Sequence, residues 1–220
     1  YYTFSWIKLM SDYTYKISCI LQTIALKTFS TWSIYGSENV PPKGSLLVVA
    51  NHLSYIDPSL LACAIPRRLN FLAKKEVFKP IVRNFLSAYG AFPIDRKLRD
   101  RKALLWASST LNEDKVLVIF PEGQRHPITK MQKPLAGAAM LALKTQSVIL
   151  PVGITGSETL GPLWRIALPT GKISVNIGYP FTLPNIEGPM TQPLLNSFAE
   201  TIMQRIATLL PKDYQGIYKT

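Results

Sequence analysis

The sequence predicts an α/β fold, with a mostly parallel central sheet flanked by helices and an N-terminal amphipathic helical segment. Two observations indicate this class. Continuous apolar runs at residues 46–50 and 116–120 are typical of strands buried on both faces of a parallel sheet. Segments with helical spacing of apolar residues alternate with such runs, as expected of an α/β domain. A chain of 220 residues, 47% of them hydrophobic, can bury the core of one such domain.

Residues 3–34 are expected to form an interrupted helix, because apolar residues recur there at spacings of three and four. The stripe consists of Trp6, Met10, Tyr13, Ile17, Ile20, Leu21, Ile24 and Phe29. Such a helix can lie in a membrane interface with its apolar face down, or it can pack on its own domain, and both alternatives stay open here. We therefore predict a helical membrane-association segment over residues 1–34 and an α/β domain over residues 35–220.

The first half of the predicted domain alternates strands with helices. Residues 46–50 form a buried strand, and Asp57-Pro58 marks the start of a helix that runs to about Ala64, since Asp favours the N-cap and Pro the first helical position. The further elements expected in this half are a short strand at 71–73, a helix at 76–88 broken at Pro80, a strand at 91–94 and a helix at 97–111.

The second half continues the same alternation. Residues 116–120 form another buried strand, and the alanine-rich residues 134–145 form a helix suited to close packing on a sheet. The remaining elements are strands at 148–154 and 173–177 and a last helix at 194–210 that Pro211 ends.

No segment reaches the roughly 18 apolar residues of a membrane-spanning helix. The sequence begins at Tyr1 rather than Met, which leaves open an anchor or targeting segment upstream. Cys19 and Cys63 lie among apolar neighbours and outside any CxxC pair. This argues against a zinc site or a disulfide and favours a reducing compartment.

The formal net charge of +12 predicts an anionic partner, which is a nucleic acid, an anionic membrane or a phosphorylated substrate. Residues 67–102 hold 11 of the 25 Lys and Arg and only three acids. The alternative is an exposed face that is merely solvated, but apolar and aromatic residues are mixed through this stretch. Because neither an RNP1 nor a C₂H₂ pattern is present, we expect no nucleic-acid partner.

The most informative histidine is His52, which directly follows a buried strand, where functional groups of α/β sheets gather. Asp57 lies five residues later, across a tight loop. A carboxylate bonded to one ring nitrogen fixes the tautomer, and the other nitrogen then accepts a proton from a hydroxyl. The alternative is a helix-capping Asp beside an incidental His. No GxSxG elbow occurs, which favours direct attack by a substrate hydroxyl over an acyl-enzyme.

A second candidate block, residues 120–126, follows the other buried strand and should open on the same edge of the sheet. Glu122 and Arg125 are charged residues at a strand end, and Gly123 lets backbone approach a ligand closely. The alternative is an ordinary turn with an ion pair. For phosphate binding, the candidates elsewhere in the chain are Arg96, Lys74 and Lys75, each of which follows a short expected strand.

Four blocks together resemble those of the glycerolipid acyltransferase family, typified by 1-acylglycerol-3-phosphate acyltransferases. They are an NHxxxxD block with Asn51, His52 and Asp57; a GxxFIxR-type block with Gly90, Ile94 and Arg96; an FPEGTRS block with Phe120, Pro121, Glu122, Gly123 and Arg125; and an apolar-Pro-Val block with Leu150, Pro151 and Val152. The likeness spans about residues 32–182. Pro93 departs from an aromatic position, and Gln124 and His126 replace the usual Thr and Ser.

The resemblance implies that His52 acts as general base with Asp57 orienting it, and that the acceptor hydroxyl attacks the thioester of acyl-CoA or acyl-carrier protein. It implies that Arg96, Arg125 and Lys74 or Lys75 bind the acceptor's phosphate, with Glu122 orienting the acceptor or anchoring Arg125. No metal or bound cofactor is implied. The expected product is phosphatidic acid, made by a membrane-associated enzyme on the cytoplasmic face.

Three alternatives stay open. They are the same chemistry on another acceptor such as glycerol-3-phosphate or a glycolipid, a thioesterase that uses water, and a non-catalytic basic lipid-binding module.

Overall fold

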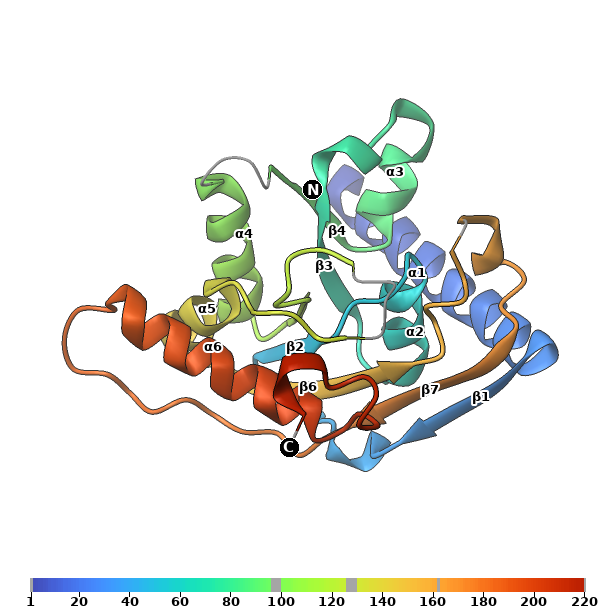
Figure 1. The fold of residues 1–220 in the computed structure, drawn as a ribbon. Helices are drawn as coiled ribbons and strands as arrows, with labels where there is room; N and C mark the ends of the chain where they lie inside the picture. Colours follow the sequence, from blue (N-terminus) through green and yellow to red (C-terminus); the bar gives the residue numbers. More distant parts are fainter. Residues whose placement is uncertain (1, 96–99, 126–129, 162, 220) are drawn as a thin grey trace.

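The computed structural model describes residues 2–95, 100–125, 130–161 and 163–219. Within these ranges the chain folds around one seven-stranded sheet with helices on both faces (Figure 1). The strands are β1 (Ser30–Tyr35), β2 (Leu46–Ala50), β3 (Leu69–Lys74), β4 (Ala91–Ile94), β5 (Val116–Ile119), β6 (Val148–Thr155) and β7 (Gly171–Ile177). The predicted fold class is confirmed.

The strand order is β1-β7-β6-β2-β5-β3-β4, and every neighbouring pair is parallel except β6 with β7. Strands β2 to β6 therefore all point the same way, so their carboxyl ends share one edge of the sheet. This edge is where ligands bind in open α/β sheets.

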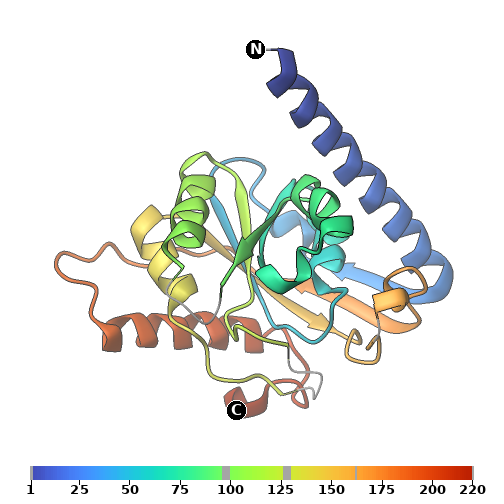
Figure 2. The same cartoon turned by 90° about the horizontal axis from the view of Figure 1, so that it is seen from above.

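Helices cover the sheet in two layers (Figures 1 and 2). They are α1 (Tyr2–Phe29), α2 (Asp57–Ala64), α3 (Pro80–Ala88), α4 (Arg101–Asn112), α5 (Gly137–Thr145) and α6 (Gln192–Ala207). Helices α1 and α2 lie over one face, with α3 against α1 and β4, and α4, α5 and α6 lie over the other.

Strand β2 shows why a continuous apolar run marks a central strand. All five of its residues are buried. Leu46, Val48 and Ala50 pack in the core under α1 and α2, whereas Leu47 and Val49 pack in the core under α4, α5 and α6. Both faces of the strand are covered, so no position tolerates a polar side chain.

The N-terminal segment differs from its prediction. Helix α1 runs without interruption from Tyr2 to Phe29, and residues 30–34, which were expected to be helical, belong to β1. This strand pairs in parallel with β7 along Ser30 to Tyr35. The physical reason is local composition, because β-branched and aromatic residues such as Thr31, Trp32 and Ile34 favour the pleated surface that β7 offers them.

Helix α1 has one packed face and one exposed face. Tyr15 and Leu26 are buried against the domain, where α1 contacts α2, α3 and β1. The predicted apolar stripe points outward instead. Between 54% and 65% of the surface is exposed at Met10, Tyr13, Ile17, Ile20, Leu21 and Ile24. No helix in the described ranges is long and apolar enough to cross a membrane.

Smaller differences concern helix ends. Pro80 begins α3 rather than breaking a longer helix, because a proline at the first turn lacks only an N–H that would be unpaired there. Asp100 caps α4 by accepting a hydrogen bond from the Ala103 N–H at 3.0 Å. Helix α5 begins at Gly137, and α6 ends at Ala207.

Candidate active site

His52 lies two residues beyond the end of β2, the middle strand of the sheet, at the edge shared by the carboxyl ends of the parallel strands. Its Nδ1 lies 2.8 Å from Oδ2 of Asp57, the first residue of α2. The histidine and the carboxylate are therefore in hydrogen-bond contact, as their spacing in the sequence predicted. The side chain of His52 is 11% exposed, and that of Asp57 is fully buried.

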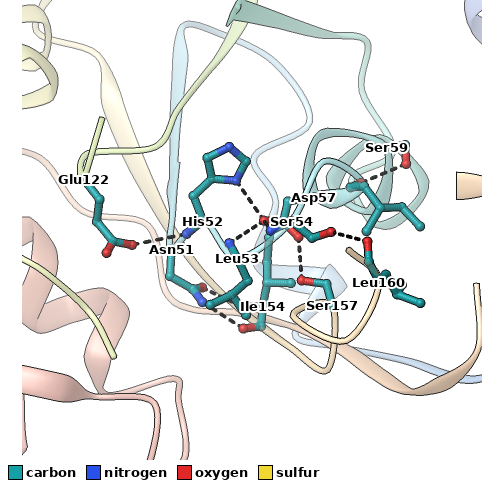
Figure 3. Close-up of polar contacts among 11 residues, drawn as sticks. Asn51, His52, Leu53, Ser54, Asp57, Ser59, Glu122, Ile154, Ser157 and Leu160 are labelled. Atoms are coloured by element: carbon teal, nitrogen blue, oxygen red, sulfur yellow. Dashed lines mark hydrogen bonds and ion pairs between the residues drawn. The ribbon is translucent and has the colours of Figure 1, made fainter. Parts of the chain in front are cut away.

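The loop between β2 and α2 is built around the carboxylate of Asp57 (Figure 3). Its Oδ2 also accepts hydrogen bonds from the backbone N–H groups of Leu53 and Ser54, at 2.7 and 2.8 Å. Its Oδ1 accepts the hydroxyl of Ser157 at 2.6 Å. Four donors thus hold the buried carboxylate in one orientation, and they stabilise its negative charge where water cannot.

The ring of His52 is fixed by packing as well as by Asp57. It stacks on Phe120 with 4.0 Å between ring centroids and 16° between ring planes. With Nδ1 directed to Asp57, Nε2 faces away from the carboxylate (Figure 3). This arrangement holds one tautomer and presents Nε2 as a proton acceptor, which is what a general base needs.

Glu122, in the loop after β5, is hydrogen-bonded to the loop after β2 that carries His52. Its Oε1 accepts the backbone N–H of His52 at 3.2 Å, and its Oε2 accepts the backbone N–H of Gln132 at 2.9 Å. The expected anchoring of Arg125 by Glu122 is not what the structure shows, because both carboxylate oxygens bind backbone amides and Arg125 contacts Tyr55. Glu122 therefore positions the backbone that carries His52.

Burial raises the pKa of Glu122 from 4.5 to about 7, although its two backbone donors oppose this shift. Between pH 4.5 and 7 the folded chain thus keeps a proton that the unfolded chain has released, so ionisation destabilises the fold as pH rises. The loss of unfolding free energy across this window is about 3 kcal/mol.

We expect the wild type to lose stability relative to Glu122→Gln by about this amount between pH 5 and pH 8. Comparing the two chains cancels the other titrating groups, and the unpaired amide donor of glutamine adds an offset that does not change with pH. Urea denaturation at intervals of one pH unit measures the difference. A difference that is the same at pH 5 and pH 8 contradicts the assignment.

Arg125 lies beside the dyad rather than within it. Its guanidinium carbon is 3.4 Å from the centroid of the Tyr55 ring, a contact that holds the cation over the loop between β2 and α2. A cavity of about 230 Å³ opens here, lined by Leu53, Ser54, Arg125, Glu158 and Gly161. The cavity thus brings the Arg125 cation close to the loop that carries His52, and the carboxylate of Glu158, which accepts the Tyr214 hydroxyl, lies on the same wall.

The other predicted site residues lie outside the loop between β2 and α2. Lys74 and Lys75 are exposed at the carboxyl end of β3, on the same edge as His52, and Lys75 forms an ion pair with Asp95. Gly123 adopts a left-handed turn at φ 73°, where a Cβ would lie 2.5 Å from Leu135. The lack of a side chain at Gly123 therefore leaves room for the side chain of Leu135. Arg96 and His126 lie outside the described residues.

Two buried residues support the site in ways that the sequence did not predict: Ser157 was not singled out, and Asn51 was named in its block without a role. Ser157 bonds Asp57, and Asn51 exchanges two hydrogen bonds with the backbone of Ile154 on β6, at 2.9 and 2.7 Å. The block at 150–152 was predicted only as an apolar strand. The signal was the continuation Gly156-Ser157-Glu158, polar residues after a buried strand that reaches the same edge. The described His, Cys, Asp and Glu side chains form no group of three or more that would hold a metal ion.

Comparison with known proteins agrees with this geometry. The sequence model of the family described as "Acyltransferase" matches residues 32–155. A 1-acyl-sn-glycerol-3-phosphate acyltransferase of Borreliella burgdorferi is 30% identical over 122 residues, which are 54% of this chain and 49% of the relative. One of Chlamydomonas reinhardtii is 32% identical over 189 residues, 84% of this chain and 54% of the relative. The chain spans about half the length of these curated relatives.

A solved structure extends the likeness to three dimensions. The crystal structure of the 1-acyl-sn-glycerophosphate acyltransferase from Thermotoga maritima superposes with a TM-score of 0.71 at 28% identity, covering 90% of this chain and 79% of that one. The family match covers more than half of the chain, and it includes His52, Asp57 and Glu122. The chain belongs to the acyltransferase family.

Proposed function

We propose that the chain transfers a fatty acyl group from a thioester to the free hydroxyl of 1-acylglycerol-3-phosphate, which gives phosphatidic acid. The observation that carries this proposal is the contact between His52 and the buried Asp57, with Nε2 turned away from the carboxylate. The relatives, which are named as 1-acyl-sn-glycerol-3-phosphate acyltransferases, support the reaction and the acceptor.

In this reaction Nε2 of His52 removes the proton of the acceptor hydroxyl while the hydroxyl oxygen attacks the thioester carbon. The buried carboxylate of Asp57 stabilises the imidazolium that forms. The tetrahedral intermediate then collapses, the carbon–sulfur bond breaks, and the imidazolium returns the proton to the departing thiolate. The products are the new ester and a free thiol, and no covalent enzyme intermediate is needed.

The cavity beside His52 is the proposed site of the acceptor's phosphate. Arg125 already lies at its wall, held over Tyr55, so a phosphate binds a cation that loses little freedom. Lys74 and Lys75 on the same edge add positive potential, whereas Arg96 lies outside the described residues. Gln124 and His126, which stand where the family block has Thr and Ser, flank Arg125 in the sequence. Because these differences bear on acceptor choice, glycerol-3-phosphate and a glycolipid should be tested in the same assay.

Ser157→Ala tests the positioning of the dyad. We expect kcat/KM to fall about tenfold, because Asp57 loses the charge-assisted hydrogen bond that fixes the orientation of its carboxylate toward His52. The carboxylate then attracts the imidazolium more strongly, so the acid limb of the pH profile of kcat/KM moves to higher pH. The matched control is Ser174→Ala, which removes a 2.7 Å hydroxyl bond to Thr155 on β6. Equal pH profiles for the two variants would mean that Ser157 is merely structural.

The same proposal places the enzyme on an anionic membrane surface, at the cytoplasmic face. Helix α1 supports this, because its outward face is apolar over four turns and carries Lys16 and Lys27 among exposed positions. Helix α3, which packs on α1, adds exposed apolar side chains at Ile81 and Phe85. Together they make a surface that can enter the headgroup region while basic residues meet anionic lipid.

Replacing Ile17, Leu21 and Ile24 with Gln is expected to weaken binding to anionic vesicles about a hundredfold. Each apolar side chain that is lost removes about 1 kcal/mol of the free energy of burial in the membrane. These positions are exposed, so the fold stays intact. The control is Ile217→Gln, an equally exposed apolar residue outside α1 and α3. Flotation with and without high salt measures binding. A triple variant that floats like the wild type rules out docking through α1.

The reaction itself is tested by following thiol release from a long-chain acyl-CoA and from acyl-carrier protein. We expect release to depend on 1-acylglycerol-3-phosphate. A thioesterase would release thiol at the same rate without acceptor, and a lipid-binding module would release none. Glycerol-3-phosphate and a glycolipid serve as competing acceptors, and preference for either would change the substrate while keeping the chemistry.

A further inference from the structure

A second cavity, of about 450 Å³, lies where α3, β4 and α4 meet at the open edge of the sheet. The residues that give it chemical character are Phe78, Arg83, Ala91, Phe92 and Trp106. Apart from Trp106, its lining comes from the basic stretch of residues 67–102, most of whose charge the acceptor site does not use. None of the dyad residues lines it.

The cavity wall combines flat rings with an available cation. Phe92 and Trp106 stack with 4.6 Å between centroids and 13° between planes, and both are half-buried. Arg83 is exposed, and the described residues place no carboxylate in an ion pair with it. The other lining arginine, Arg68, is already paired with Asp12 at 2.9 Å. Arg83 is therefore the cation that can bind a phosphate.

The backbone of β4 adds a hydrogen-bonding pattern. In the described sheet β4 pairs only with β3. The carbonyl of Gly90 accepts the Phe71 N–H at 2.9 Å, so strand alternation turns the N–H and C=O of Ala91 away from β3. An adjacent donor and acceptor on an open edge complement the donor and acceptor that adenine presents side by side. Rings, cation and edge together fit a phosphorylated adenosine better than a lipid headgroup.

The distance to the dyad suits such a ligand. The strand registers place Ala91 on β4 level with Phe71 on β3, Val118 on β5 and Val48 on β2. Three strand spacings separate Ala91 from Val48, which is roughly 14 Å. His52 follows Val48 by four residues, which adds roughly 13 Å along the strand direction, so the straight path is roughly 19 Å. The diphosphate and an extended pantetheine arm together can cover this path across the carboxyl ends of β3 and β5.

We propose that this cavity binds the adenosine 3′-phosphate 5′-diphosphate end of acyl-CoA, with Arg83 on a phosphate and the adenine against β4. The pantetheine arm then carries the thioester to His52. This inference rests on the proposed function, because it assigns that reaction's donor to coenzyme A. It separates the donor site at β4 from the acceptor site at Arg125.

The test compares donors with and without the nucleotide. For Arg83→Gln we expect KM for acyl-CoA to rise about tenfold while KM for acyl-pantetheine, which lacks the nucleotide, stays unchanged. The matched control, Arg101→Gln, removes an exposed arginine of α4 that does not line the cavity and should change neither. Equal KM changes for both donors would overturn the proposal. An effect confined to acyl-carrier protein would overturn it too, since the surface would then bind that protein.

Equilibrium binding makes the test independent of catalysis. Adenosine 3′,5′-bisphosphate should quench the fluorescence of Trp106, and the quenching should vanish in Trp106→Phe and require higher ligand concentrations in Arg83→Gln. Binding without acyl transfer would support the nucleotide site and reject the proposed function. Acyl transfer from acyl-CoA with no binding at this cavity, or with binding unaffected by Arg83→Gln, would retain the function and reject the site.

Discussion

His52→Ala is expected to lower kcat of acyl transfer about a thousandfold, because the acceptor hydroxyl loses its general base. The fold should survive the change. Asp57 keeps the hydrogen bonds from Leu53, Ser54 and Ser157, so no buried charge is left without partners. Loss of the ring contact with Phe120 costs about 1 kcal/mol.

The measurement is the rate of acceptor-dependent thiol release at saturating substrates, with urea denaturation of the same preparation as the control for folding. A variant that is folded and retains more than a tenth of the wild-type rate would show that another group takes the proton. A variant that is unfolded would contradict the hydrogen-bond argument for Asp57.

Asp57→Asn is expected to lower kcat by a similar factor for a different reason. The amide oxygen can replace Oδ2 and keep the donors of the loop, and the amide N–H₂ can donate to Ser157, whose hydroxyl also accepts. The fold therefore loses only about 1–3 kcal/mol. The negative charge is gone, however, so the imidazolium formed during attack is no longer stabilised.

Stability and activity must be measured together for this variant, across a range of pH. We expect a folded chain whose rate stays low at every pH, since no protonation state restores the carboxylate. Near-normal activity would show that Asp57 only fixes the loop before α2, where it binds the amides of Leu53 and Ser54, and takes no part in catalysis.

The central site was predictable because its key contact is local. His52 and Asp57 are joined by one short loop, and the strand before them and the helix after them each carry a clear signal. The partners of Glu122 were not predictable, because they are backbone amides that no side-chain pattern reveals. Ser157 reaches Asp57 only because β6 lies beside β2, a pairing between segments 100 residues apart.

In the fold, too, elements with a local sequence signal were predicted, and elements that depend on distant partners were not. The continuous apolar runs predicted the central strands, which are buried on both faces wherever they occur. The edge strand β1 was mistaken for the end of a helix, since its strand conformation depends on pairing with β7 rather than on its own periodicity. The outward stripe of α1 is a third case, because periodicity identifies an apolar face without identifying what covers it.

We infer that His52 takes the proton of an acceptor hydroxyl during acyl transfer from a thioester. The most direct measurement follows a labelled acyl chain from acyl-CoA, in the presence of 1-acylglycerol-3-phosphate, for the wild type and His52→Ala. We predict one molecule of labelled phosphatidic acid for each thiol released by the wild type, and almost none by the variant. Labelled free fatty acid in place of phosphatidic acid, or equal product from both chains, would contradict the claim.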